Sequence, residues 1–138
     1  MSPKRLAPVI AHAGEALDRL RAHRAERVRV RDEQLGSLER ISVQRTEAAV
    51  TVPFEQREQF LRFCAGLDLR EQALHDQIGA LNAELDDLRD QLLAAHRYHR
   101  SLEFLRDREL AALRKQEERR QARSGDEQAV RNWLAEAS

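Results

Sequence analysis

The chain has 138 residues, enough for one domain or one extended unit, and 35% of them are charged while only 4% are aromatic. Five Gly and three Pro among long runs of Leu, Ala, Glu and Arg are typical of long helices or coiled coil and argue against a compact globule with a thick core. The formal net charge is zero, so charge alone gives no general attraction to nucleic acid or membranes.

A first helix is predicted near residues 4–46. Its apolar residues follow steps of four and three, are interrupted by an arginine-rich stretch, and then return: Leu6, Ile10, Ala13, Leu17, Leu20, and later Val28, Leu35, Leu38. The interval between Leu20 and Val28 contains one step too many for a clean heptad, which resembles a stutter.

A turn is predicted near residues 47–52. The β-branched residues Val50, Thr51 and Val52 weaken helix, and Pro53 disfavours helix in the residue before it. A second helix should begin at about residue 53 and run to about 122. Because a short connection between two helices normally makes them antiparallel neighbours, we expect a hairpin.

The second helix carries a coiled-coil seam, meaning a stripe of residues spaced by fours and threes. The stripe consists of Phe60, Cys64, Leu67, Glu71, Leu74, Ile78, Leu81, Leu85, Leu88, Leu92, Ala95, His99 and Leu102. All are apolar except Glu71 and His99, and such a strict repeat keeps one narrow face against a partner helix. Cys64, the single cysteine, is expected to behave as a small hydrophobe; it also excludes an intrachain disulfide.

The register follows from the turn. If the turn centres near residue 51, facing residues have numbers that sum to roughly 102, which places Arg31 in the seam opposite Glu71. The first helix then ends beside the point where the seam of the second helix ends, so residues 103–121 form a helical arm that has no partner helix. Gly125 is expected to break that arm before a short last helix at about 125–136.

The predicted fold is therefore all-α: an elongated two-helix antiparallel coiled-coil hairpin with unequal arms and a short C-terminal helix, in a single unit of residues 1–138. No apolar run reaches the roughly 18 residues of a membrane span, and no leader-like apolar stretch follows the first residues, so we expect a cytoplasmic protein.

No catalytic site, cofactor site or metal site is predicted, and the protein is not expected to be an enzyme. His96 and His99 share a helix face, but two such ligands would hold a metal only with others from elsewhere. The six arginines between Arg19 and Arg31 spread round their helix among acidic residues. We interpret them as a solvated face or a surface for an acidic partner rather than a nucleic-acid stripe.

Two features near the C-terminus suggest a protein partner. One is a basic run on the unpaired arm, formed by Arg114, Lys115, Arg119, Arg120 and Arg123. The other is Trp133, which shares an amphipathic face with Val130 and Leu134 and is costly to leave in water.

The region 55–135 resembles the long second helix of the FliJ/YscO family of type III secretion systems. The resemblance consists of a Phe/Leu-rich start, a later Leu-Glu-x-Leu element with an Arg/Glu-rich run over 106–120, and the final "DEQAVRNW". The start comprises Phe60, Leu61, Phe63 and Leu67, followed by Leu74 and Gln77, and the later element comprises Leu102, Glu103 and Leu105.

The resemblance implies a non-enzymatic stalk, likened to the central stalk of rotary ATPases, on the cytoplasmic side of the inner-membrane secretion apparatus. It implies three partners: a hexameric secretion ATPase, the export-gate membrane protein, and secretion chaperones. The gate-contacting residues would be Phe60, Phe63 and Leu67. The ring-facing residues would be the N-terminus with the arm, including Arg114, Lys115, Arg119, Arg120, Arg123 and Trp133.

Two other functions stay open. A self-associating coiled-coil scaffold would pair its arms between chains, whereas a stalk should be monomeric on its own. A nucleic-acid-binding helical hairpin is a third possibility, and it would show strongly salt-dependent binding.

Overall fold

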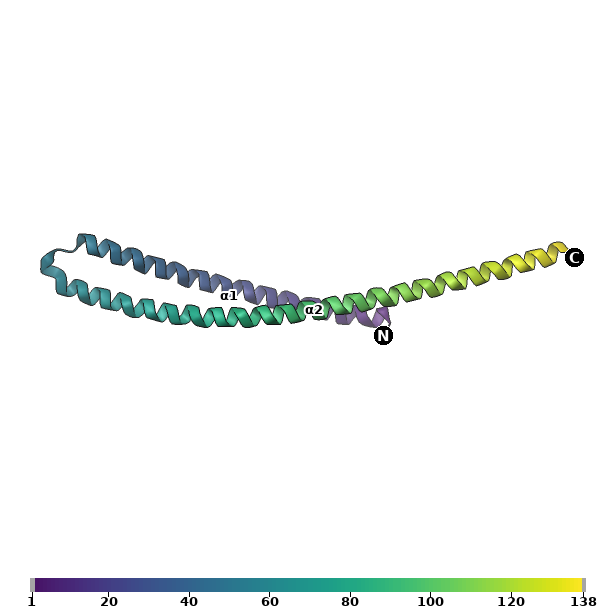
Figure 1. Cartoon of the computed structure of the whole chain (residues 1–138), viewed down its shortest axis with the longest axis horizontal. Helices are drawn as coiled ribbons and strands as arrows, with labels where there is room; N and C mark the ends of the chain where they lie inside the picture. The colour runs from purple at the N-terminus through teal and green to yellow at the C-terminus, as the bar shows by residue number, and fades with distance from the viewer. Residues whose placement is uncertain (1, 138) are drawn as a thin grey trace. The chain divides into compact units, whose positions relative to one another are not determined.

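Two long helices account for almost all of the chain in the computed structural model, which describes residues 2–137. Helix α1 is Pro3–Thr51, a 3₁₀ turn η1 is Phe54–Gln56, and helix α2 is Arg57–Ala137 (Figure 1). The described residues contain no strand, and the two helices pack together, so the predicted all-α hairpin is confirmed.

Helix α1 continues past the predicted end near residue 46 and stops at Thr51. The Val52 amide still donates to the Ala48 carbonyl at 3.2 Å, after which Pro53 is extended with φ −67° and ψ 153°. A β-branched residue lowers helix propensity by only a fraction of a kcal/mol. Pro53 imposes a stricter limit because its ring disfavours helix at Val52. The turn therefore lies at residues 52–56 instead of 47–52.

Helix α2 passes through Gly125 without a break, so the predicted separate helix at 125–136 is wrong. A single Gly in a helix costs about 1 kcal/mol relative to Ala. The neighbouring Ala, Arg, Glu and Gln residues favour helix, and no Pro follows Gly125 to stop it.

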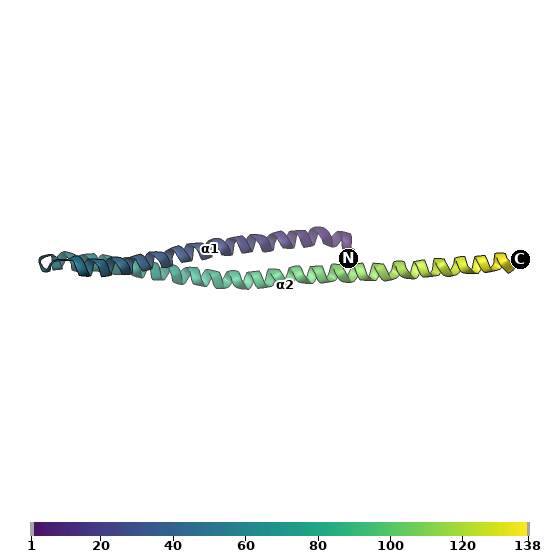
Figure 2. The same cartoon turned by 90° about the horizontal axis from the view of Figure 1, so that it is seen from above.

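The packing of the chain forms two compact units. One is Leu17–Ala94, which contains the turn; the other combines the chain before residue 17 with the chain after residue 94. In each unit a stretch of α1 lies beside a stretch of α2 (Figures 1 and 2). Most of the shielded side chains belong to the predicted seams, and on α2 the shielded stripe continues past Leu102 to Arg106 and Glu109.

The seam predicted for α2 is confirmed. Each of its positions from Phe60 to Leu102 is buried or half-buried, including Glu71 and His99. Among the other residues of the range 60–102, only Glu84 is half-buried. The buried members are Leu67, Ile78, Leu81, Leu85 and Leu88. The heptad spacing therefore identified the face of α2 that packs.

The seam of α1 differs from the prediction in its middle. The buried residues are Leu6, Ile10, Ala13, Leu17 and Ile41. After the half-buried Leu20, the shielded positions that keep the heptad steps are Arg27, Arg31, Gln34, Leu38, Ile41, Arg45 and Ala48. Arg24, on the same steps, is exposed, while Val28 and Val30 are half-buried beside the stripe. The α1 seam is therefore irregular after Leu20, where the sequence predicted a stutter, and Leu35 is exposed. Long Arg and Gln side chains can occupy such positions because their stems pack while their heads reach water.

The register is shifted from the predicted one. In the unit Leu17–Ala94, Arg45 donates to Glu71 at 2.8 Å and Arg27 donates to Glu84 at 3.1 Å. These residue numbers sum to 116 and 111, compared with the predicted 102. The predicted Arg31–Glu71 pair is therefore wrong, and Arg31 lies 3.5 Å from its neighbour Asp32 instead. The later turn, at residues 52–56, accounts for part of this shift, because it moves every facing pair toward higher numbers.

Candidate partner-binding surfaces

The last part of α2 is the most exposed part of the described chain. Every residue from Leu110 to Ala137 is exposed, whereas Leu102, Leu105 and Glu109 are half-buried. The bare arm therefore begins near residue 110 and not at 103. The shifted register explains the difference, because Gly14 lies against His99 and the start of α1 reaches further along α2 than predicted.

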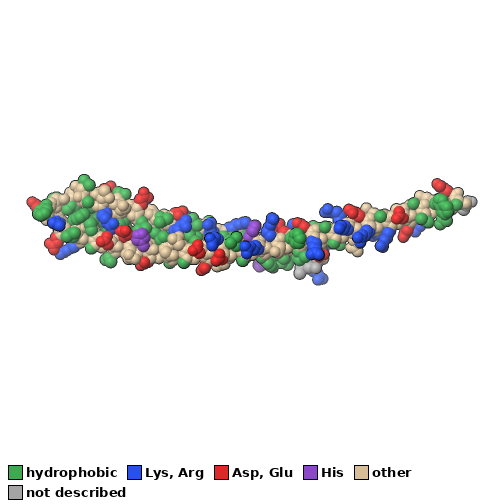
Figure 3. Space-filling model, in the orientation of Figure 1, with side chains coloured by type: hydrophobic (Ala, Val, Ile, Leu, Met, Phe, Trp, Pro, Cys, Tyr) green, Lys and Arg blue, Asp and Glu red, His purple; other side chains and the backbone are tan. Residues whose placement is uncertain are grey.

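Three of the five basic residues predicted on this arm lie on one face. Lys115, Arg119 and Arg123 follow each other at four-residue steps, so they lie in a row along α2. Arg120 differs, because it donates to Glu117 at 2.7 Å and thereby lowers the pKa of that carboxyl. Within residues 2–137, Arg114 and the three residues of the row have no ion pair, so their charge is not neutralised by the chain. Figure 3 shows Lys and Arg side chains, with acidic side chains among them, along this part of α2.

The arm ends in a small apolar face. Val130, Trp133 and Leu134 are all exposed, with 66% exposure for Trp133. Their spacing of three and four residues places them on one side of α2. Asp126 and Glu127 lie one turn before Val130 and line a shallow hollow beside it. The predicted position of Trp133 on an amphipathic face thus agrees with the geometry of the helix.

A second apolar surface surrounds the turn. Of the three residues that the resemblance assigned to the export gate, Phe63 is 46% exposed, Phe60 is half-buried, and Leu67 is only 1% exposed. Leu67 therefore lies in the core of the hairpin. Sequence reasoning missed Phe54, which is 84% exposed, together with Val50 and Leu61. Their signal was available, since apolar residues outside a heptad seam face away from the partner helix.

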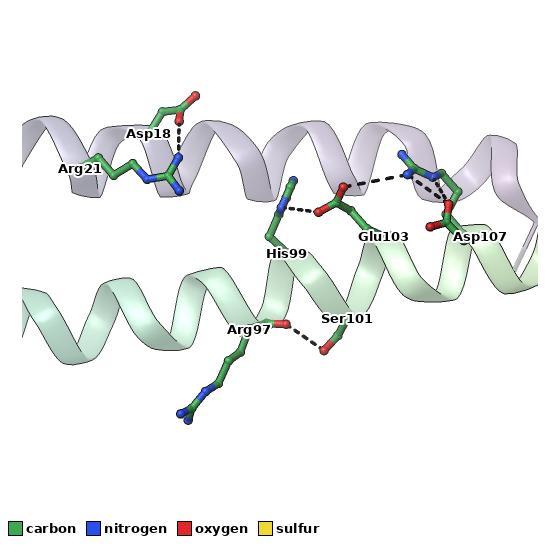
Figure 4. A network of polar contacts seen from close by, with 8 residues as sticks. Asp18, Arg21, Arg97, His99, Ser101, Glu103 and Asp107 are labelled. Atoms are coloured by element: carbon green, nitrogen blue, oxygen red, sulfur yellow. Dashed lines mark hydrogen bonds and ion pairs between the residues drawn. The ribbon is translucent and has the colours of Figure 1, made fainter.

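His99 takes part in a chain of polar contacts. Its Nδ1 lies 3.1 Å from Glu103, and Arg106 lies 4.0 Å from Glu103 and 3.2 Å from Asp107 (Figure 4). This arrangement keeps a polar seam residue satisfied beside Gly14. His96 is exposed, and no group of three or more metal-ligating residues occurs among the residues that the structure describes.

The arginines between Arg19 and Arg31 are mostly paired with carboxylates. Arg21 contacts Asp18, Arg27 contacts Glu84, and Arg29 contacts both Glu26 and Glu33. The hydrogen bond from Arg29 lowers the pKa of Glu26. Paired guanidinium groups are poorly placed to neutralise phosphates, which argues against a nucleic-acid stripe here.

The described helices contain no segment with the length and apolar character needed to cross a membrane. A search of curated proteins and a search of solved structures each found no significant match. A family model does match: the model described as "Flagellar FliJ protein" covers residues 1–138. The match spans both helices, the turn and the exposed arm, and members of this family are components of type III flagellar export. The chain therefore belongs to the flagellar FliJ family.

Proposed function

We propose that this protein is a non-enzymatic stalk of the export apparatus, which engages the hexameric export ATPase through the start of α1 and the arm at residues 110–137. The apolar surface around the turn, in the unit Leu17–Ala94, contacts the export gate and secretion chaperones. The protein thereby couples the ATPase to the gate on the cytoplasmic side of the inner membrane.

The observation that supports ATPase engagement is the basic row on the arm. Lys115, Arg119 and Arg123 are exposed, lie on one face, and have no ion pair within the described chain. Charges of this kind raise the rate of encounter with an acidic surface and fix orientation, and their effect weakens with salt. A helix without shielding on any side is suited to a site that surrounds it, such as the pore of a ring.

The test reverses the row and measures the cognate export ATPase. We expect Lys115→Glu with Arg119→Glu and Arg123→Glu to lower ATPase stimulation at least about tenfold at low salt, because the steering charge is inverted. The three positions are exposed, so helix content should be unchanged. A matched control makes the same charge change at three other exposed arginines of α2 that have no ion pair in the described chain: Arg57, Arg97 and Arg100. Equal stimulation by both variants would refute the assignment of the arm to the ring.

The proposed gate contact is tested separately. Phe54→Ala with Phe63→Ala removes the two exposed aromatic side chains at the turn and should leave ATPase stimulation intact. Binding to the gate's cytoplasmic domain and protein secretion should both fall, since buried aromatic anchors dominate most protein interfaces. Unchanged gate binding would show that the turn is not the contact.

A further inference from the structure

A groove with an apolar floor runs between α1 and α2 in the unit Leu17–Ala94. Its volume is about 380 Å³, and its floor is formed by Ile41 and Leu74. Ile41 is 6% exposed, so the floor is continuous with the hairpin core. Gln44 and Gln77 add amide groups at the sides.

Two guanidinium groups flank this floor without carboxylate partners. Arg40 donates only to the Ser37 hydroxyl, at 2.9 Å, and Arg70 has no polar contact within residues 2–137. No Asp or Glu lines the groove. It therefore suits an apolar side chain that is accompanied by carboxylates, as on an acidic amphipathic helix.

The chain itself contains a helix of that chemistry. The apolar face of Val130, Trp133 and Leu134 is preceded by Asp126 and Glu127, whose carboxylates have no ion pair in the described part of the chain. The segment 126–137 contains three acidic residues and one basic residue. Its charge is thus opposite to that of the groove, and its apolar face matches the floor.

We propose that the groove between Arg40 and Arg70 binds the C-terminal helix, residues 126–137, of a second copy of this chain. Trp133 inserts over Ile41 and Leu74, while Asp126 and Glu127 pair with the two arginines. The contact is small, so association is weak and reversible. This inference does not rest on the proposed ATPase or gate contacts. It competes with the ATPase contact of the arm, because Trp133 is covered while two copies are joined, and at about 1 µM the chain is monomeric, as expected of a stalk.

Trp133 is the only tryptophan of the sequence, so its fluorescence reports the contact directly. Over a dilution from about 100 µM to about 1 µM of full-length protein, a weak complex should dissociate and Trp133 emission should shift to longer wavelength. Sedimentation velocity over the same range should show dimers giving way to monomers. A monomer at every concentration would overturn the proposal. Trp133 emission that stays at the same short wavelength at every concentration would also overturn it, because it indicates a contact within one chain.

Charge reversal locates the site. Arg40→Glu with Arg70→Glu should weaken self-association at least about tenfold, since Arg and Trp anchors dominate such interfaces. The control Arg24→Glu with Arg57→Glu makes the same charge change at two exposed arginines and should have no effect. Equal weakening by both variants would overturn the assignment of the groove, because it would show that the contact lies elsewhere or that only the net charge of the chain affects self-association.

A mixing experiment separates lost binding from lost folding. The tail variant Asp126→Arg with Glu127→Arg should also fail to self-associate. When it is mixed with the groove variant Arg40→Glu with Arg70→Glu, the native tail of one chain meets the native groove of the other, and the two sets of reversed charges also face each other. Association should therefore return. An absence of association in the mixture, with both variants helical, would overturn the assignment of groove and helix.

Discussion

Leu67 and Leu69 lie two residues apart on α2 and offer a direct test of the seam. Leu67 is 1% exposed and Leu69 is 75% exposed, so the same substitution removes packing at one position and almost none at the other. Both positions are inside a helix, and replacement by Ala has the same effect on helix propensity at each. The difference between the two variants therefore measures burial in the hairpin.

The expected magnitude follows from the packing. Truncating a buried Leu to Ala destabilises a protein by about 2–5 kcal/mol, and the lower part of that range applies where neighbours can collapse into the space. A two-helix hairpin has a thin core, so we expect about 2–3 kcal/mol for Leu67→Ala. Leu69→Ala should change the free energy of unfolding by less than about 0.5 kcal/mol.

Urea unfolding followed by circular dichroism measures both variants. With an m-value of about 2 kcal/mol/M, the midpoint for Leu67→Ala should fall by about 1–1.5 M urea, and that for Leu69→Ala should stay in place. Equal midpoints for the two variants would show that Leu67 is not packed in the core of the hairpin, and Leu67 would then be a candidate surface contact. Gate binding by folded Leu67→Ala should remain, because the side chain lies inside the hairpin.

Three further predictions follow from the same structure. Arg45 lowers the pKa of Glu71 by a hydrogen bond and by its charge. The pair therefore stabilises the fold fully above the unfolded-state pKa of Glu, about 4.3, and this stabilisation is lost as the pH falls through the lower folded-state pKa. Arg45→Met should therefore reduce the melting temperature at pH 7 and converge with the native protein toward pH 2–3, and a constant difference would contradict the pairing. Hydrogen exchange should be slowest in residues 60–98 and fastest in 110–137, where no side chain is shielded; uniform protection would show that the arm is covered. Gly79→Ala should raise stability by about 1 kcal/mol in urea unfolding, since an added Cβ meets no atom within 4 Å, and a loss would mean that the site is not open.

The sequence by itself determined which residues of α2 pack. A heptad repeat is a local property of one helix, and side chains four and three residues apart share a face whatever the partner is. The seam from Phe60 to Leu102 was therefore predictable, including its polar members Glu71 and His99. The exposed basic row and Trp133 were also predictable, because apolar and charged spacing on a helix can be read directly.

Features that depend on the partner helix were decided by tertiary structure. The register could not be read from either seam, because any shift by whole heptads matches apolar residues equally well. It depended on where α1 ends and on how the two helices pack, and the structure pairs Glu71 with Arg45 instead of Arg31. The middle of the α1 seam was hidden for another reason. Arg27, Arg31 and Gln34 are polar in sequence, and only packing against α2 shows that their stems are shielded.

The same distinction applies to the partner surfaces. Leu67 and Phe63 are similar apolar residues in the sequence, yet one lies in the core and the other reaches solvent. The groove between Arg40 and Arg70 combines residues from both helices, so it exists only in the register that the structure adopts. Local spacing determines which face a side chain occupies, but the contact between helices decides which faces remain free and which charges remain unpaired.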